Sequence, residues 1–64
     1  MLYIKIDKTI KTPYYKQIVQ SIQKAIDMKL LHDRDRLPTL EEVTSYYQIS
    51  NISVIRAYNE LENI

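Results

Sequence analysis

A short, mainly polar run near the end of the chain has the side chains best suited to contact a charged partner. It comprises Ser50, Asn51, Ile52 and Ser53, and Arg56 follows three positions later. Hydroxyl, amide and guanidinium groups bond to phosphate oxygens and to base edges, and an isoleucine can contact a thymine methyl group. The segment could therefore contact DNA, although each residue also has a structural alternative.

The polar residues of this run are also typical of a helix start. Ser50 is foremost a helix cap, because serine is favoured at that position. A phosphate contact by Ser50 is compatible with capping, since helix N-termini attract anions. Asn51 and Ser53 could contact DNA or be solvated residues of the first turn.

The two larger residues of the run have alternatives as well. Ile52 could pack beneath the preceding helix, as apolar residues usually do, or contact thymine methyl groups. Arg56 could bind phosphate or guanine, or pair with Glu60 four positions later.

Two residues that precede this run, Arg36 and Thr39, are further candidates for phosphate contacts. Arg36 could reach the DNA backbone or anchor the loop in which it lies, and Thr39 is a helix cap first and a phosphate donor second. We therefore include both among the candidate DNA-binding residues.

Other chemistry finds little support. His32 is the single histidine, and although Asp33 and Asp35 could join it at a metal ion, neighbouring loop residues usually point in different directions. The chain has no cysteine and no paired nucleophile and base. We expect no enzyme activity, no cofactor and no metal site.

The composition is that of one small domain. A chain of 64 residues buries about 60% of its unfolded surface, so its stability is marginal. The net charge of +1 neither announces nor excludes a nucleic-acid partner. The absence of cysteine fits the cytoplasm, and no apolar run is long enough to suggest a membrane partner.

Periodicity predicts one strand and one long helix in the first half of the chain. Residues 2–7 alternate as a short strand does, and such a strand needs a partner. Thr12 as N-cap and Pro13 at the first position indicate a helix over about 13–29. Its expected apolar stripe contains Tyr15, Ile18, Val19, Ile22, Ala25, Ile26 and Leu30.

Two further helices are expected in the second half. Thr39 and Glu42 form a capping-box pattern that begins a short helix over 39–47. Ser50 caps the last helix, over 50–63, whose apolar stripe contains Val54, Ala57, Tyr58 and Leu61. A short second helix and a tight turn into the third match the helix-turn-helix plan, in which the third helix enters the major groove.

Several short motifs of the sequence resemble those of a known protein family. "TPYYKQIVQSIQKAI" resembles the opening of the GntR-type winged-helix domain, Pro-x-Tyr-x-Gln-Ile with spaced isoleucines. "DRLPT", which contains Arg36, looks like that family's Asp-Arg-Leu-Pro-Ser. "ISNISVIRAYNELE" is similar to its Val-Ser-x-x-Thr-Val-x-x-Ala-x-x-x-Leu. The "IKID" opening and "AYNELE" ending look like the YtrA-like branch.

The chain departs from the family pattern at several places. Glu41 and Asn51 stand where the family usually has arginines that contact phosphate and base, and Lys29 and Gln48 replace glycines. The wing hairpin expected after the third helix is missing, so the single domain, residues 1–64, looks truncated before the wing. Glu41, the near-neutral charge and the missing wing keep open an alternative, a helical protein-interaction module that has lost DNA binding.

The resemblance implies an all-α or mainly α fold: a winged-helix domain reduced to its three-helix core, with a short N-terminal strand. It implies sequence-specific binding of double-stranded operator DNA by a bacterial transcription regulator, as a repressor. The full-length protein is expected to be a homodimer on a near-palindromic site.

Overall fold

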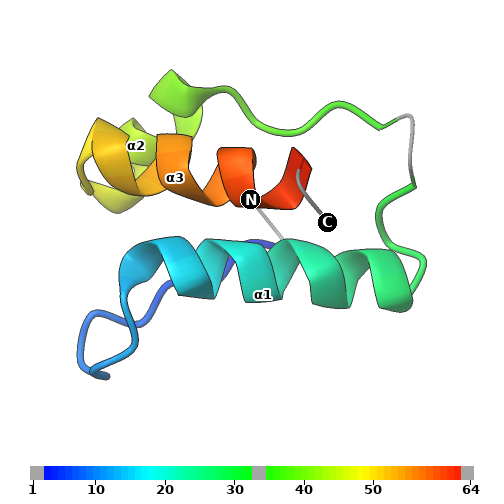
Figure 1. The fold of residues 1–64 in the computed structure, drawn as a ribbon, viewed down its shortest axis with the longest axis horizontal. Coiled ribbons are helices and arrows are strands. Elements are labelled where there is room, and N and C mark those ends of the chain that lie inside the picture. The colour runs from blue at the N-terminus through cyan, green and yellow to red at the C-terminus, as the bar shows by residue number, and fades with distance from the viewer. Residues whose placement is uncertain (1–2, 33–34, 63–64) are drawn as a thin grey trace.

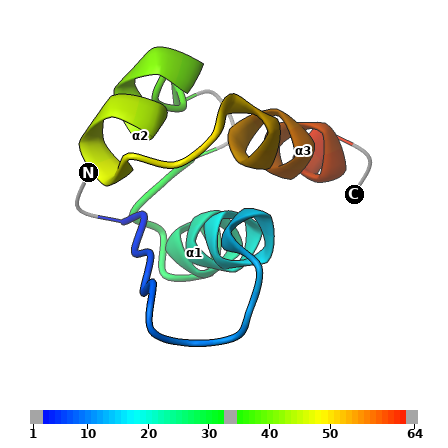
Figure 2. The same ribbon diagram turned by 90° about the vertical axis from the view of Figure 1, so that its left-hand side faces the viewer.

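The structure consists of three helices. It is a computed structural model that describes residues 3–32 and 35–62. Helix α1 spans Tyr14–Asp27, α2 spans Leu40–Tyr47 and α3 spans Asn51–Glu62. In Figure 1, α3 lies over α1 with α2 beside it, and Figure 2 shows the same arrangement from the end of the molecule. This confirms the expected all-α helix-turn-helix fold.

Helix α3 is the central element of the described residues. Its backbone lies close to both other helices, whereas within those residues no Cα atom of α1 lies within 8 Å of a Cα atom of α2. Val54 and Ala57 of α3 are fully buried in one core cluster with Ile18 and Ile22 of α1 and Val43 of α2. The predicted stripe of α3 is thereby confirmed at its two innermost positions, and Tyr58 and Leu61 pack against the cluster.

The ends of α1 differ from the prediction. Pro13, not Thr12, is the N-cap residue, and no side chain caps the helix. At the other end Lys29 takes a left-handed backbone with φ 61°. The Leu30 N–H then bonds back to the Ala25 carbonyl at 2.8 Å and ends the helix.

This early helix end changes which residues reach the core. Leu31 is buried, while Leu30 remains 63% exposed. The prediction of Leu30 as part of the apolar stripe is therefore wrong, because the left-handed turn rotates the chain away from the helical period. Ile26, also predicted in the stripe, is exposed.

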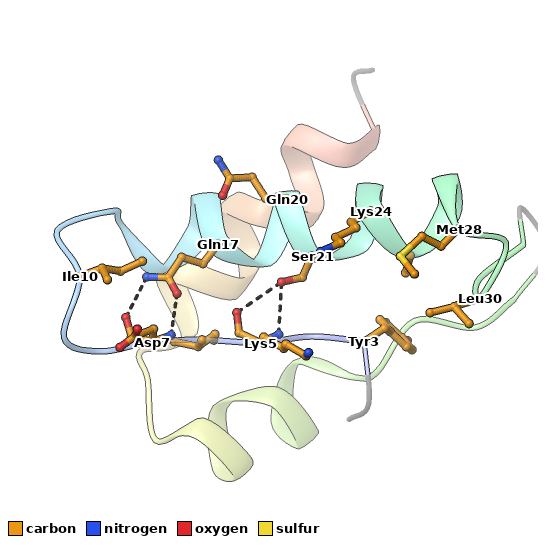
Figure 3. A pocket seen from close by; sticks show the side chains of 12 residues that line it. Tyr3, Lys5, Asp7, Ile10, Gln17, Gln20, Ser21, Lys24, Met28 and Leu30 are labelled. Atoms are coloured by element: carbon orange, nitrogen blue, oxygen red, sulfur yellow. Dashed lines mark hydrogen bonds between the residues drawn. The ribbon is translucent and has the colours of Figure 1, made fainter.

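The predicted N-terminal strand is wrong for the part of it that the structure describes: residues 3–7 form no ladder. They run extended beside α1 and bond to its side chains (Figure 3). Ser21 Oγ accepts from the Lys5 N–H at 3.2 Å, and Gln17 Oε1 accepts from the Asp7 N–H at 2.7 Å. Without a partner strand, backbone groups must find side-chain partners, and α1 supplies them.

Gln17 is the buried polar residue that makes this arrangement possible. Its Nε2 donates to the carbonyl oxygens of Asp7 at 3.1 Å and of Thr12 at 2.9 Å. The Tyr47 hydroxyl of α2 donates to the Ile4 carbonyl from the other side. The N-terminal segment is thus tied to two helices, and Ile4 is buried between them.

The start of α2 is as predicted. Thr39 is the N-cap residue, and its Oγ1 accepts from the Glu42 N–H at 3.2 Å. The Tyr58 hydroxyl of α3 donates to the Pro38 carbonyl at 2.6 Å, which fixes the entry into α2 against α3. Burial raises the pKa of Tyr58 to about 12, and nearby Tyr3 and Glu42 add to the shift.

The two residues that stand where the family pattern has glycine both have a left-handed backbone. Lys29 has φ 61°, and Gln48, which ends α2, has φ 55°. Side chains with a Cβ pay a steric cost in this region that glycine avoids. The chain therefore keeps the backbone shape that glycine favours without using glycine.

Among the described residues, no helix combines the length and the apolar character needed to cross a bilayer.

We expect Gln48→Gly to raise the free energy of unfolding by about 0.5 to 1 kcal/mol, because it removes the cost of a Cβ at positive φ. The same change at Gln20, an exposed residue within α1, should lower it by about the same amount. Urea unfolding followed by circular dichroism measures both. Destabilisation by both variants would show that the turn at Gln48 is not strained.

We expect Tyr58→Phe to lower the free energy of unfolding by about 1 kcal/mol at neutral pH, through loss of the bond to Pro38. The folded protein holds the Tyr58 proton more tightly than the unfolded chain. Wild-type stability should therefore fall as pH rises from 10 toward 12, and the variant should lose that part of the fall. Urea unfolding at a series of pH values tests this; a difference between the two proteins that stays constant up to pH 12 would contradict it.

Candidate nucleic-acid interface

The face of α3 opposite the core is exposed to solvent. Asn51, Ile52, Ile55, Arg56 and Asn59 are all exposed, while Val54 and Ala57 point inward. These five residues, which we call the α3 face, lie on one side of the helix because they recur at spacings of three and four. Three candidates from the sequence, Asn51, Ile52 and Arg56, belong to it. The exposure of Ile55 was not predicted from the sequence. The available signal was that Ile55 lies outside the apolar stripe that contains Val54.

Ser50 caps α3, as predicted. Its Oγ accepts from the Ser53 N–H at 3.4 Å and lies 3.3 Å from the Ser53 Oγ. Ser53 is half-buried, so it lies beside the α3 face rather than at its centre. Both hydroxyls are engaged with each other, and a bound phosphate would have to share or replace that contact.

Ile52 does not pack beneath α2. It is 76% exposed, so that structural alternative is wrong. Residue 52 is two positions from Val54 in α3, and two residues span about 200° of helix, which turns Ile52 away from the core. The apolar character of Ile52 therefore has no structural use within the described residues.

Arg56 is held by two neighbours. Its guanidinium carbon lies 3.9 Å from the centre of the Tyr15 ring of α1, and its Nε lies 3.7 Å from a carboxylate oxygen of Glu60. The pairing with Glu60, one of the two alternatives from the sequence, is present. The contact with Tyr15 was missed because 41 residues separate the two positions. The side chain of Arg56 is still 59% exposed, so both contacts leave it accessible.

The remaining two candidates lie on the connection to α2. Thr39 is half-buried with its hydroxyl bonded within α2, and Arg36 is exposed. The Tyr58–Pro38 bond ties this connection to α3. Glu41 and Glu42 occupy the first turn of α2 and are exposed. Their negative charges interact favourably with the helix dipole but repel an approaching phosphate.

A cavity lies on a different side of the molecule. It has a volume of about 490 Å³ and lies between residues 3–10 and α1 (Figure 3). None of its lining residues comes from α3, and Gln17 and Ser21 in its wall already bond the backbone. The described residues contain no group of three acidic, histidine or cysteine side chains placed to hold a metal ion.

Comparisons with known proteins identify two similar repressors. The chain is 38% identical over 60 residues to the HTH-type transcriptional repressor STM4068 of Salmonella typhimurium, covering 94% of this chain and 25% of that protein. It is 32% identical over 59 residues to the HTH-type transcriptional repressor YtrA of Bacillus subtilis, covering 92% of this chain and 45% of YtrA.

The chain thus spans less than half of the length of either relative. No family model matches the sequence, and no solved structure matches it. The similarity nevertheless extends over nearly all of this chain, and the three helices have the helix-turn-helix order. These findings confirm the resemblance to GntR-type regulators of the YtrA-like branch.

Proposed function

We propose that this chain is a DNA-binding domain of a bacterial transcription regulator, and that it binds double-stranded operator DNA as part of a repressor. The observation that carries the proposal is the α3 face, a solvent-exposed side of the third helix that bears amide, guanidinium and apolar groups. The names of the two similar repressors support the same function. Such a protein would act in the cytoplasm and would not be an enzyme.

In the proposed complex α3 lies in the major groove with its N-terminal residues at the base edges. Asn51 and Ile52 would face bases, and Arg56 would reach a phosphate or a guanine. Ser50 and Ser53 would bind phosphate at the start of α3. Thr39 and Arg36 would contact the backbone from the connection to α2.

The proposed binding is modest for a single copy of this chain. The net charge of +1 gives little general attraction, and Glu41 and Glu42 oppose phosphate near α2. Non-specific affinity is expected in the range of about 10⁻⁴ to 10⁻⁶ M at physiological salt. We further infer that the full-length protein is a homodimer, since helix-turn-helix dimers bind two half-sites about one helical turn apart and so add their contacts.

We expect Arg56→Ala to weaken binding to duplex DNA and to reduce the slope of log affinity against log salt by about one, the loss of one phosphate contact. The matched control is Lys24→Ala, which removes the same charge from an exposed residue at the cavity beside α1. Fluorescence anisotropy with short mixed-sequence duplexes at several salt concentrations measures both. Circular dichroism of each variant checks that loss of the Tyr15 contact has not unfolded the protein.

The outcomes separate the proposal from the alternative protein-interaction module. Equal affinities and equal slopes for Arg56→Ala and Lys24→Ala would contradict the proposed contact between Arg56 and DNA. No binding to any duplex at low salt would contradict DNA binding and leave the interaction module as the better account of Glu41.

A further inference from the structure

The α3 face carries more apolar surface than a solvated helix needs. Ile52 is 76% exposed and Ile55 is 47% exposed. Side chains three positions apart on a helix are neighbours, so the two isoleucines form one adjacent pair. Arg56 and Asn59 border this pair on the same exposed side.

The pair is not needed by the core. The buried positions of α3 are Val54 and Ala57, which already close the contact with α1 and α2. Three of the other exposed apolar side chains, Ile10, Met28 and Leu30, line the cavity beside α1, which has no residue of α3 in its wall. Ile52 and Ile55 are therefore a separate apolar patch, continuous with the polar groups proposed to contact DNA.

In the major groove, the apolar group that distinguishes one base from another is the C5 methyl of thymine. An isoleucine can gain affinity there by removing that methyl group and its own side chain from water. An arginine or asparagine beside it would bond to base edges or phosphates without competing for the methyl. The chemistry of the patch thus matches one feature of duplex DNA.

We propose that Ile52, supported by Ile55, is a specificity-determining residue that recognises thymine methyl groups, so that preferred sites contain A·T pairs opposite this part of α3. The inference rests on the proposed function. It adds a preference that phosphate contacts cannot supply, since they carry no sequence information.

The test uses duplexes selected by the wild-type protein from a random pool and then resynthesised with uracil in place of thymine. Uracil pairs as thymine does but lacks the methyl group. We expect uracil to lower wild-type affinity by a factor of about four for each buried methyl. Ile52→Ala should bind both forms equally, with an affinity close to that of the wild type for the uracil form.

Ile10→Ala is the matched control, because it makes the same change at an exposed isoleucine away from α3. It should keep the full difference between thymine and uracil. Equal wild-type affinity for both forms, with binding still dependent on salt, would overturn methyl recognition while leaving the proposed function intact. Absence of binding to either form would instead contradict the proposed function.

Discussion

The whole arrangement depends on α3, which packs against both other helices. Val54 and Ala57 are fully buried in the core that α1 and α2 share with α3. Because one side of α3 is committed to this core, the helical period fixes which residues face outward, and these form the α3 face. Loss of the packing at Val54 or Ala57 would both separate the helices and change the orientation of the proposed DNA-binding residues. Stability and the proposed function therefore depend on the same packing contacts.

A chain without glycine and with a marginal core needs other means to fix its connections. Side chains of the helices bond to the backbone of the connecting segments: Gln17 holds the residues around Asp7, and Tyr58 holds Pro38. Lys29 and Gln48 adopt left-handed backbone conformations, which end α1 and α2 and let the chain turn. Each bond is modest, but together they place the start of α2 and the N-terminal segment against the helices.

Local patterns predicted the helices well and tertiary contacts poorly. The cap at Thr39, the cap at Ser50 and the buried stripe of α3 follow from residue types and spacing. The end of α1 could not be placed, because nothing in its apolar period signals a left-handed lysine at position 29. Residues 3–7 alternate as a strand does, yet their bonding partners are side chains of α1 rather than another strand. The stacking of Arg56 on Tyr15 joins distant positions, and the exposure of Ile52 goes against the usual burial of isoleucine.

The most direct test of the central claim is an NMR titration of the ¹⁵N-labelled protein with duplex DNA. If α3 enters the groove, the amide signals of Asn51, Ile52, Arg56 and Asn59 should shift most, with smaller shifts at Thr39. Signals from the opposite wall of α1, at Gln20 and Lys24, should stay in place. Shifts concentrated around the cavity beside α1, or shifts absent from α3, would contradict the account.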